Sequence, residues 1–529
     1  MSDLIADPET DAAATYAVDP ALARRLARRI VASPRAQTRT AYAPFTGAPI
    51  AMLPVSTPGD VEVAIEGARA AQRAWAQRDL ADRARCLLRL HDLVLAAQDD
   101  LLDLIQIENG KSRAHAFEEI LDVAIVARHY GRRASSYLRP RKRQGAFPLL
   151  SQAVEQRLPK GVVGIIAPWN YPLTLAVSDT LPALLAGNAV VLKPDSQTAL
   201  TALRALELLA DAGIPEGLVR VVVGDGPVVG TAIVEHADYV CFTGSTRTGR
   251  LVAEQAGRRL VGASLELGGK NAMYVAQDAD LDRAAEGAVR ACFSSTGQLC
   301  ISVERMLLHE EIADAFLDQF VARVRALRMG PAMDFSVDVG SLISAQQLET
   351  VTRHVDDAVA GGARVLAGGK ARPDLGPLFY EPTILEGVQP GMTCYAEETF
   401  GPVVSVYRVG GDDEAVRFAN EGDYGLNASI WTRDVTRGRR LAARIKAGTV
   451  NINEAYAAAW GSMGAPMGGM RSSGLGRRHG AEGITKYTEA QNVTVQRLLG
   501  FGAPFGMSHS QWTRTLTFAM KVMKRVGVR

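Results

Sequence analysis

The chain has 529 residues, which is too many for one hydrophobic core, so two or three domains are expected. Lys and Arg (59) nearly balance Asp and Glu (57), which gives no support to a nucleic-acid partner. No apolar run approaches the roughly 18 residues that a membrane span requires. An acidic N-terminus and five scattered cysteines indicate neither a secretory signal nor a disulfide framework, so we expect a cytoplasmic protein. The eight histidines show no metal-ligand spacing, and no metal is expected.

In chain order, the first elements are surface helices, predicted by helix-period apolar residues over Val61–Ala74 and Asp82–Ala97. From about residue 160 the pattern changes. Short β-rich runs at 161–167, 189–192, 218–223 and 239–242 alternate with helical segments near 176–187, 198–212 and 228–236. Apolar strands separated by helices predict a parallel sheet covered on both faces, which is the layout of a dinucleotide-binding domain.

A second α/β pattern follows Gly268-Gly269. Its strands are expected at 273–275, 305–308, 363–367, 403–409, 428–432 and 448–452. The segment Ser151–Pro159 alternates as a strand does and lies between basic patches, so it predicts an arm that leaves the domain. We expect this arm and the stretch after about 484 to pair across subunits, because an exposed strand has unpaired backbone groups.

Five short motifs carry the chemistry. They are Pro168-Trp169-Asn170, Phe242–Thr246, Leu265–Asn271, Gly297-Gln298-Leu299-Cys300 and Glu398–Pro402. In this order and spacing they resemble the aldehyde dehydrogenase superfamily over roughly residues 40 to 490. The resemblance implies an α/β fold with a Rossmann-type dinucleotide-binding domain, an α/β catalytic domain and a small β oligomerisation arm.

The resemblance also implies domain boundaries and an oligomer. The dinucleotide-binding domain would take 1–141 and 161–266, the catalytic domain 267–478, the arm 142–160 and 479–500, and a C-terminal extension 501–529. A homodimer or homotetramer is expected. In the extension, Trp512, Leu516, Ala519, Met523 and Val526 recur at helical spacing near basic residues. Such a stripe packs on its own protein or a sister subunit, the interpretation we favour, or lies on an anionic membrane.

Cys300 is the predicted nucleophile. A thiolate adds to the aldehyde, the resulting thiohemiacetal gives up hydride, and water hydrolyses the thioester. A thiolate is only a few per cent formed at neutral pH unless the pKa of the thiol is lowered. The alternative is a buried structural cysteine, which we assign to the other four: Cys86, Cys241, Cys292 and Cys394.

Two further residues complete the predicted catalytic set. Asn170 would donate its side-chain N–H to the oxyanion, alongside the backbone N–H of Cys300. Glu266 would be the general base for the hydrolytic water. Alone, Asn170 would be interpreted as a turn residue and Glu266 as a surface cap; together with Cys300 they favour catalysis.

The coenzyme is expected to be a nicotinamide dinucleotide. Gly244, Ser245 and the helix after them would hold its pyrophosphate, because free backbone N–H groups at a helix start favour an anion. By resemblance, Glu398 would hold the nicotinamide ribose and Phe400 would lie beside the nicotinamide. The resemblance adds Trp169 and Leu267 to the same site.

Lys193 and Ser196 are expected at the adenine ribose, at the end of the second core strand. Family members that prefer NAD often carry Glu in place of Ser196. A carboxylate there would cost roughly 3 kcal/mol against a 2′-phosphate at about 5 Å in an effective dielectric near 20. Its absence, with Lys193 nearby, predicts NADP, with NAD possible. We assume that Asp195 points away.

A second resemblance bears on the aldehyde substrate. Stretches around Trp169, Lys193 and Trp460 resemble the actinobacterial branch of NADP-dependent succinate-semialdehyde dehydrogenases, which implies succinate semialdehyde. The carboxylate-binding arginines of better-known relatives align with Ser294 and Ser178, neither of which offers a bidentate guanidinium.

Other features of the same region leave alternatives open. Asp179 stands where many members have lysine, and Arg471 is an alternative source of positive charge. The apolar loop Tyr456–Trp460 would suit a hydrophobic aldehyde. Two other classes are a CoA-acylating dehydrogenase, against which Glu266 argues, and a non-catalytic structural relative, against which the complete catalytic set argues.

Overall fold

The computed structural model describes residues 18–145, 151–497 and 502–527. Residues 1–17, which we assigned to the dinucleotide-binding domain, lie outside the described residues. The helices before the first sheet are α1 (Pro20–Ala27), α2 (Pro58–Ala76), α3 (Leu80–Ala96), α4 (Gln98–Asn109) and α5 (Arg113–Leu138), with a hairpin of β1 (Thr38–Tyr42) and β2 (Pro49–Pro54). Thr57 and Asp60 form a capping box that starts α2. The two helices predicted here are therefore confirmed as α2 and α3.

The first sheet has the strand order β17-β9-β8-β5-β6-β7 and is parallel except at β17. Its strands are β5 (Val162–Ile166), β6 (Ala189–Lys193), β7 (Val219–Val221), β8 (Tyr239–Thr243), β9 (Gly262–Glu266) and β17 (Gly474–Leu475). The helices packed around it are α6 (Pro172–Val177), α7 (Thr180–Leu185), α8 (Ala199–Asp211), α9 (Thr231–His236) and α10 (Thr246–Arg258). All four predicted strands are present, and β9 and β17 complete the sheet.

The single helix predicted near 176–187 is two helices in the structure, α6 and α7. The division falls at Ser178 and Asp179, four and three residues before Pro182. Because Pro182 has no N–H to donate to the carbonyl of Ser178, one helix cannot run through this segment. The break brings Ser178 and Asp179 to the wall of a cavity.

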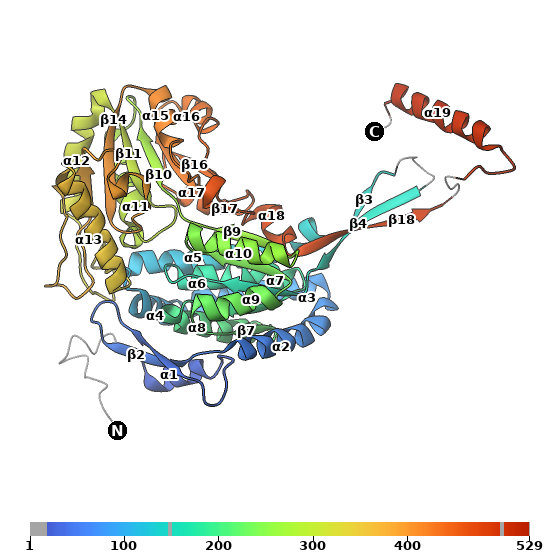
Figure 1. The fold of residues 1–529 in the computed structure, drawn as a ribbon, viewed down its shortest axis with the longest axis horizontal. Coiled ribbons are helices and arrows are strands. Elements are labelled where there is room, and N and C mark those ends of the chain that lie inside the picture. Colours follow the sequence, from blue (N-terminus) through green and yellow to red (C-terminus); the bar gives the residue numbers. More distant parts are fainter. Residues whose placement is uncertain (1–17, 146–150, 498–501, 528–529) are drawn as a thin grey trace.

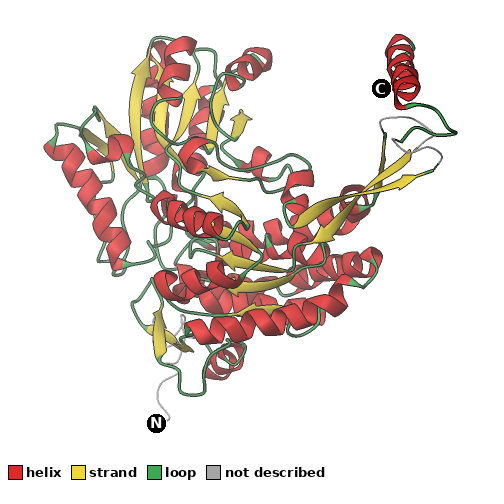
Figure 2. Ribbon diagram, turned by 45° about the vertical axis from the view of Figure 1, so that its right-hand side comes forward, coloured by secondary structure: helices red, strands yellow, loops and turns green. Residues whose placement is uncertain are grey.

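The second sheet has the order β12-β13-β14-β11-β10-β15-β16, and β12 is its antiparallel strand. Its strands are β10 (Asn271–Val275), β11 (Val303–His309), β12 (Arg364–Ala367), β13 (Thr383–Glu386), β14 (Val403–Val409), β15 (Asn427–Trp431) and β16 (Thr449–Ile452). The helices around it are α11 (Leu281–Phe293), α12 (Ala313–Arg325), α13 (Ala345–Ala360), α14 (Thr393–Ala396), α15 (Asp412–Ala419), α16 (Val435–Ala442) and α17 (Ala457–Trp460). The six predicted strands are confirmed, and helices cover both faces of the two sheets (Figure 2).

An arm extends from the body (Figure 1). It is built from β3 (Arg141–Arg143), β4 (Ser151–Pro159) and β18 (Thr488–Gln496), in the order β18-β4-β3. The predicted arm strand is correct to the residue. The predicted pairing of β4 across subunits is wrong, because β4 pairs with β18 and β3 of the same chain.

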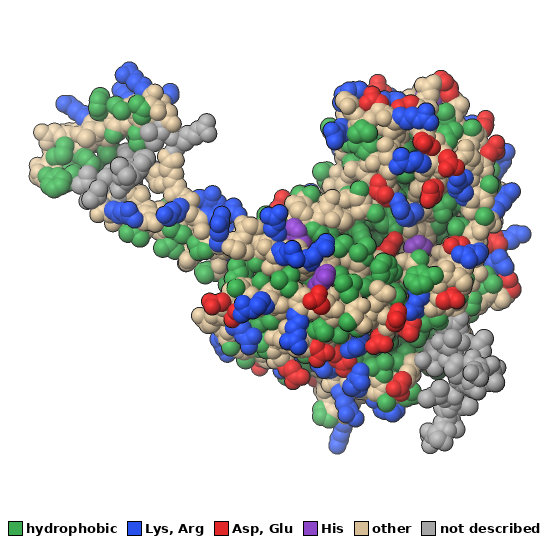
Figure 3. Space-filling model, turned by 180° about the vertical axis from the view of Figure 1, so that it is seen from behind, with side chains coloured by type: hydrophobic (Ala, Val, Ile, Leu, Met, Phe, Trp, Pro, Cys, Tyr) green, Lys and Arg blue, Asp and Glu red, His purple; other side chains and the backbone are tan. Residues whose placement is uncertain are grey.

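The C-terminal helix α19 (His509–Arg525) follows the arm and lies beyond its tip (Figure 1). It confirms the predicted helical stripe, of which Trp512 is buried. On the face seen in Figure 3, the arm and α19 carry basic and hydrophobic side chains, in keeping with the lack of any acid after Glu489. No helix among the described residues is long and apolar enough to cross a bilayer.

Candidate active site

The carboxyl ends of parallel strands bring the predicted residues together. Asn170 follows β5, Gly244 follows β8, and Glu266 is the last residue of β9. Because these strands are neighbours in one parallel sheet, their ends meet at one edge, where ligands of α/β sheets bind. Cys300 reaches the same edge from the other sheet, on the loop that leads into β11.

The loop before Cys300 has an unusual backbone. Ser295 and Thr296 take left-handed conformations with φ of 51° and 56°, which is uncommon for residues other than glycine. Gly297 also has a positive φ of 71°, and a Cβ there would lie 2.0 Å from the carbonyl oxygen of Gly401. Only glycine therefore fits at this position, which fixes the path of the chain into Cys300.

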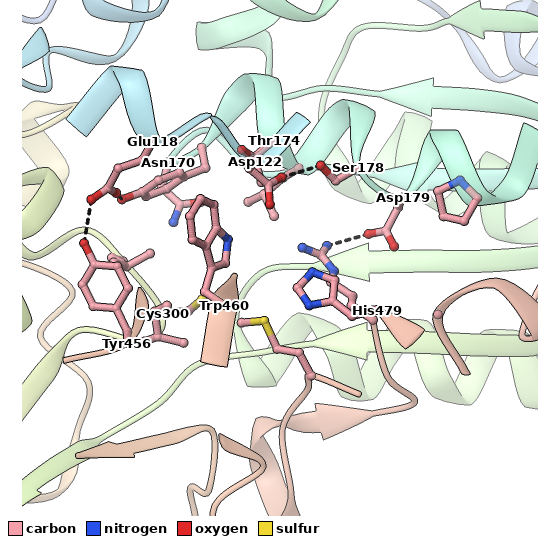
Figure 4. A pocket seen from close by; sticks show the side chains of 18 of the residues that line it. Glu118, Asp122, Asn170, Thr174, Ser178, Asp179, Cys300, Tyr456, Trp460 and His479 are labelled. Atoms are coloured by element: carbon pink, nitrogen blue, oxygen red, sulfur yellow. Dashed lines mark hydrogen bonds and ion pairs between the residues drawn. The ribbon is translucent and has the colours of Figure 1, made fainter. Parts of the chain in front are cut away.

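Cys300 lies in the wall between two cavities, and Asn170 is the other residue common to both. The first cavity is lined by residues including Glu118, Asp122, Tyr171, Ser178, Asp179, Tyr456, Trp460, Arg478 and His479 (Figure 4). The second cavity is lined by Pro168, Trp169, Thr243, Gly244, Ser245, Glu266, Leu267, Gly268, Gln347, Glu398 and Phe400, besides the two shared residues. Two ligands can thus approach one thiol from different sides.

Asn170 is held by buried polar contacts. Its Nδ2 donates to the carbonyl oxygen of Gln298 at 3.0 Å, in the loop that carries Cys300. Its own carbonyl oxygen accepts from Lys111 Nζ at 2.6 Å, and Lys111 pairs with Glu119 at 2.8 Å. Gln298 thus holds the side-chain amide of Asn170, and Lys111 holds its backbone carbonyl group.

The Cys300 thiol is not ionised by its surroundings. Burial, followed by the charges of Glu266 and Glu398, raises its pKa to about 12. The thiol must therefore lose its proton before it can act as a nucleophile. Burial raises the pKa of Glu266 to about 7, so this carboxyl group can accept a proton near neutral pH.

The second cavity fits a dinucleotide. Ser245 caps α10, its side chain accepting from the N–H of Thr248, and the start of this helix faces the cavity. A Cβ on Gly268 would lie 2.2 Å from Glu398 Oε2, so only glycine leaves that carboxylate in place. Phe400 meets the Trp169 ring edge-on, with 5.5 Å between centroids.

Six of the eight predicted coenzyme residues line this cavity, and Lys193 and Ser196 lie apart from it. Lys193 ends β6 and Ser196 begins the next turn, and both are buried. The Asp195 carboxylate accepts from the backbone N–H of Gln197 at 2.9 Å, so it is turned towards its own chain. Nearby, Arg39 pairs with Asp225 at 2.7 Å, a contact that the sequence did not indicate.

Comparison with known proteins identifies the family. The model of the "Aldehyde dehydrogenase family" matches residues 31–493. The chain belongs to the aldehyde dehydrogenase family. A protein of Mycobacterium tuberculosis (strain ATCC 25618 / H37Rv) named "Putative succinate-semialdehyde dehydrogenase (NADP+) 2" is 55% identical over 493 residues, covering 93% of this chain and 95% of the relative.

Solved structures of the family share the fold of this dehydrogenase. PnpE from Pseudomonas sp. WBC-3 is 36% identical, with a TM-score of 0.85 over 89% of this chain and 96% of PnpE. An NAD+ complex of aldehyde dehydrogenase from Bacillus cereus is 34% identical, with a TM-score of 0.83 over 87% of this chain and 93% of the relative. The resemblance to aldehyde dehydrogenases that the five motifs indicated is confirmed.

In this dehydrogenase the first cavity has an acidic wall. Glu118 accepts hydrogen bonds from the hydroxyls of Tyr171 and Tyr456, each at 2.8 Å. Ser178 donates to Asp122, whose pKa burial raises to about 6. The predicted loop 456–460 does line the cavity through Tyr456 and Trp460.

The arginine at this cavity is not one that the sequence indicated. Arg471 is exposed and donates to the carbonyl oxygens of Asn420 and Tyr424, away from the cavity. Arg478 lines the cavity instead and pairs with Asp179 at 2.6 Å. No motif pointed to Arg478, and the sole signal was an aspartate where many relatives have lysine.

Other functional contacts also escaped the sequence. Glu304 accepts from the backbone N–H groups of Thr399 and Phe400 and pairs with Lys270 at 2.5 Å. These contacts hold Phe400 in its left-handed conformation, with φ of 52°. Lys270 lies within a recognised motif, but only the fold shows what it touches.

Proposed function

We propose that this dehydrogenase oxidises an aldehyde to a carboxylic acid through a covalent intermediate on Cys300. The observation that carries the proposal is the place of Cys300 in the wall shared by two cavities, with Asn170 beside it and Glu266 in the second cavity. This arrangement lets a thiol meet an aldehyde on one side and a hydride acceptor on the other.

The proposed roles follow from the contacts. The Cys300 thiol gives up its proton to solvent water, and the thiolate adds to the aldehyde carbon. The amide of Asn170 and the backbone N–H of Cys300 stabilise the oxyanion. When bound, a nicotinamide dinucleotide accepts the hydride, leaving a thioester on Cys300. Glu266 then takes a proton from water, which attacks the thioester and releases the acid.

For the coenzyme we propose NADP. The name of the mycobacterial relative supports it, and so does Ser196, which places no carboxylate beside a 2′-phosphate. We propose Lys193 as the cation that would face this phosphate. The remaining coenzyme residues would be those predicted: Gly244 and Ser245 for the pyrophosphate, and Trp169, Leu267, Glu398 and Phe400 around the nicotinamide half.

For the substrate, the relative's name supports succinate semialdehyde. The wall of the first cavity supports a second candidate, a more hydrophobic aldehyde. Its arginine, Arg478, is already paired with Asp179, and Glu118 and Asp122 add negative charge that a substrate carboxylate would meet. The aromatic rings of Tyr456 and Trp460 favour an apolar chain.

We further propose that the enzyme works in the cytoplasm as a homodimer or homotetramer. All five cysteines are free in the structure, as is usual in reducing compartments.

A first experiment compares succinate semialdehyde with linear and aromatic aldehydes of similar length, each with NADP and NAD. The same panel is run on Cys300→Ala and Glu266→Gln. We expect Cys300→Ala to abolish oxidation while coenzyme binding stays nearly intact. Glu266→Gln should slow hydrolysis of the thioester more than hydride transfer, giving a burst of reduced coenzyme and then a slow phase. Turnover near the wild-type rate in Cys300→Ala would contradict the proposal.

A further inference from the structure

An arginine lies beside the proposed base. Arg478 Nη2 donates to Thr243 Oγ1 at 3.0 Å as well as to Asp179. Thr243 and Glu266 are register partners in the parallel pair β8–β9. Because neighbouring strands lie about 4.8 Å apart, the guanidinium is separated from Glu266 by one hydrogen bond to Thr243 and one strand spacing.

Each of these two side chains has an unsatisfied atom. Glu266 Oε1 and Arg478 Nε are both buried, and neither has a hydrogen-bond partner among the described residues. One atom is an acceptor and the other a donor. Buried polar groups nearly always have hydrogen-bond partners in folded proteins. A shared water or a small rotation of Glu266 would give both atoms a partner.

The position of Arg478 is fixed by its neighbours. Its backbone N–H donates to the carbonyl oxygen of Met467 at 2.6 Å, and its own carbonyl oxygen accepts from Met467. Its side chain is 14% exposed and is held by Asp179, which also accepts from Lys486 and Tyr487 (Figure 4 shows the Asp179 contact). The guanidinium is therefore a fixed positive charge, and Asp179 is the anion that anchors it.

We propose that Arg478 is a positioning residue that keeps Glu266 as a carboxylate for hydrolysis of the thioester, and that Asp179 moderates its effect. This inference rests on the proposed role of Glu266 as the base. By occupying the guanidinium, Asp179 prevents a direct ion pair that would hold Glu266 too tightly to take a proton from water.

The charges facing Glu266 support the proposal. Burial raises the pKa of Glu266 most, the positive charges of Arg478, Lys486 and Arg477 lower it, and Asp179 raises it. His479 adds no charge near neutral pH, because burial and the charge of Arg478 lower its pKa to about 3. Cys300 is also neutral, since its thiol has a raised pKa. Of the cations, Arg478 has the largest effect.

The test measures the pH dependence of hydrolysis. Burst and steady-state rates are recorded from about pH 5 to about pH 9 with NADP and the best aldehyde. The steady-state rate should fall on the acidic side of this pH profile as Glu266 becomes protonated, and we call this fall the acidic limb. Arg478→Gln removes the main stabilising charge, so the limb should move up by about one pH unit. Asp179→Asn removes an opposing charge, so the limb should move down.

Three further variants make the result specific. Arg478→Lys keeps the charge and should restore most of the wild-type limb. Arg477→Gln removes the same charge from the neighbouring residue, whose effect on Glu266 is the weakest, and should leave the limb nearly unchanged. Glu266→Gln should abolish the limb.

The outcomes separate the two proposals. Opposite shifts in Arg478→Gln and Asp179→Asn would support the inference, because a merely structural defect slows turnover without moving the limb in opposite directions. Equal or absent shifts would overturn it while leaving the proposed function intact. Fast hydrolysis in Glu266→Gln would instead refute the role of Glu266 itself. If Arg478→Gln fails to fold, Arg478→Lys and Asp179→Asn still test the inference. The burst amplitude then reports the fraction of enzyme molecules with a functional active site.

Discussion

At the scale of single residues, discrimination between the two coenzymes would depend on the charges at the end of β6. Ser196 carries no charge there, and the Asp195 carboxylate is committed to the backbone N–H of Gln197. Lys193 is buried, and burial lowers its pKa, while the charges of Asp195 and Asp225 oppose that effect. Lys193 and Ser196 would therefore present a cation and a hydroxyl to a 2′-phosphate, while Asp195 is bonded to its own backbone and Asp225 is paired with Arg39.

Ser196→Glu should move preference from NADP towards NAD. Repulsion between the new carboxylate and the phosphate should change the ratio of kcat/KM values ten- to a hundredfold, since each factor of ten corresponds to about 1.4 kcal/mol. The measurement belongs at low ionic strength, where screening is weakest. Ser196→Gln, of similar size but uncharged, is the control. A wild-type enzyme that strongly prefers NAD would show that Ser196 is not the discriminating residue.

At the scale of elements, a buried ion pair between Lys111 and Glu119 links helix α5 to Asn170 and the start of α6. The side chains of Lys111 and Glu119 are both 0% exposed. Glu119 Oε2 accepts from the N–H groups of Leu173 and Thr174, in the first turn of α6, while Lys111 donates to Asn170. The pair therefore fixes the start of α6 and Asn170, which lies two residues before that helix.

Lys111→Met should destabilise the enzyme by about 3–5 kcal/mol, because it leaves the Glu119 carboxylate buried without its cation. Urea unfolding followed by circular dichroism would measure the loss. In the double variant Lys111→Met/Glu119→Gln, much of the stability should return, since the remaining buried group is neutral. A single variant as stable as the wild type would show that Glu119 is satisfied without Lys111.

At the scale of the whole molecule, the arm leaves an apolar face and a strand edge uncovered. Within the described residues, β18 pairs with β4 on one side alone. Val493 and Val495 lie on one face of β18 and are 41% and 54% exposed. Exposed strand edges with apolar side chains pair readily with another chain, which favours an oligomer built through this arm.

Light scattering should therefore find a dimer or tetramer, and the double variant Val493→Lys/Val495→Lys should dissociate it. Lysine places charge on the face that a neighbouring subunit would bury. Thr494→Lys puts the same charge on the opposite face of β18 and serves as the control. An active wild-type monomer would be incompatible with this expectation.

The sequence was informative where function depends on local motifs. Cys300, Glu266 and Asn170 were predicted because each stands in a short segment whose residue types are demanded by the chemistry, and all three line the second cavity. Arg478 was not found, because its importance comes from Asp179 and Thr243, which are distant in the chain. The sequence placed 142–160 and 479–500 in one arm but did not predict the pairing of β4 with β18 within one chain, which depends on where both strands leave the body.

The shared wall at Cys300 also sets an order of events in time. Glu266 lines the second cavity and is not among the residues that line the first. In the proposed mechanism, water activated by Glu266 reaches the thioester through the space in which the hydride acceptor would lie. Oxidation and hydrolysis use the same volume in turn, so the second reaction has to wait until that volume is vacated. The speed of the cycle can consequently depend on how fast this space clears, and not on chemistry at the sulfur.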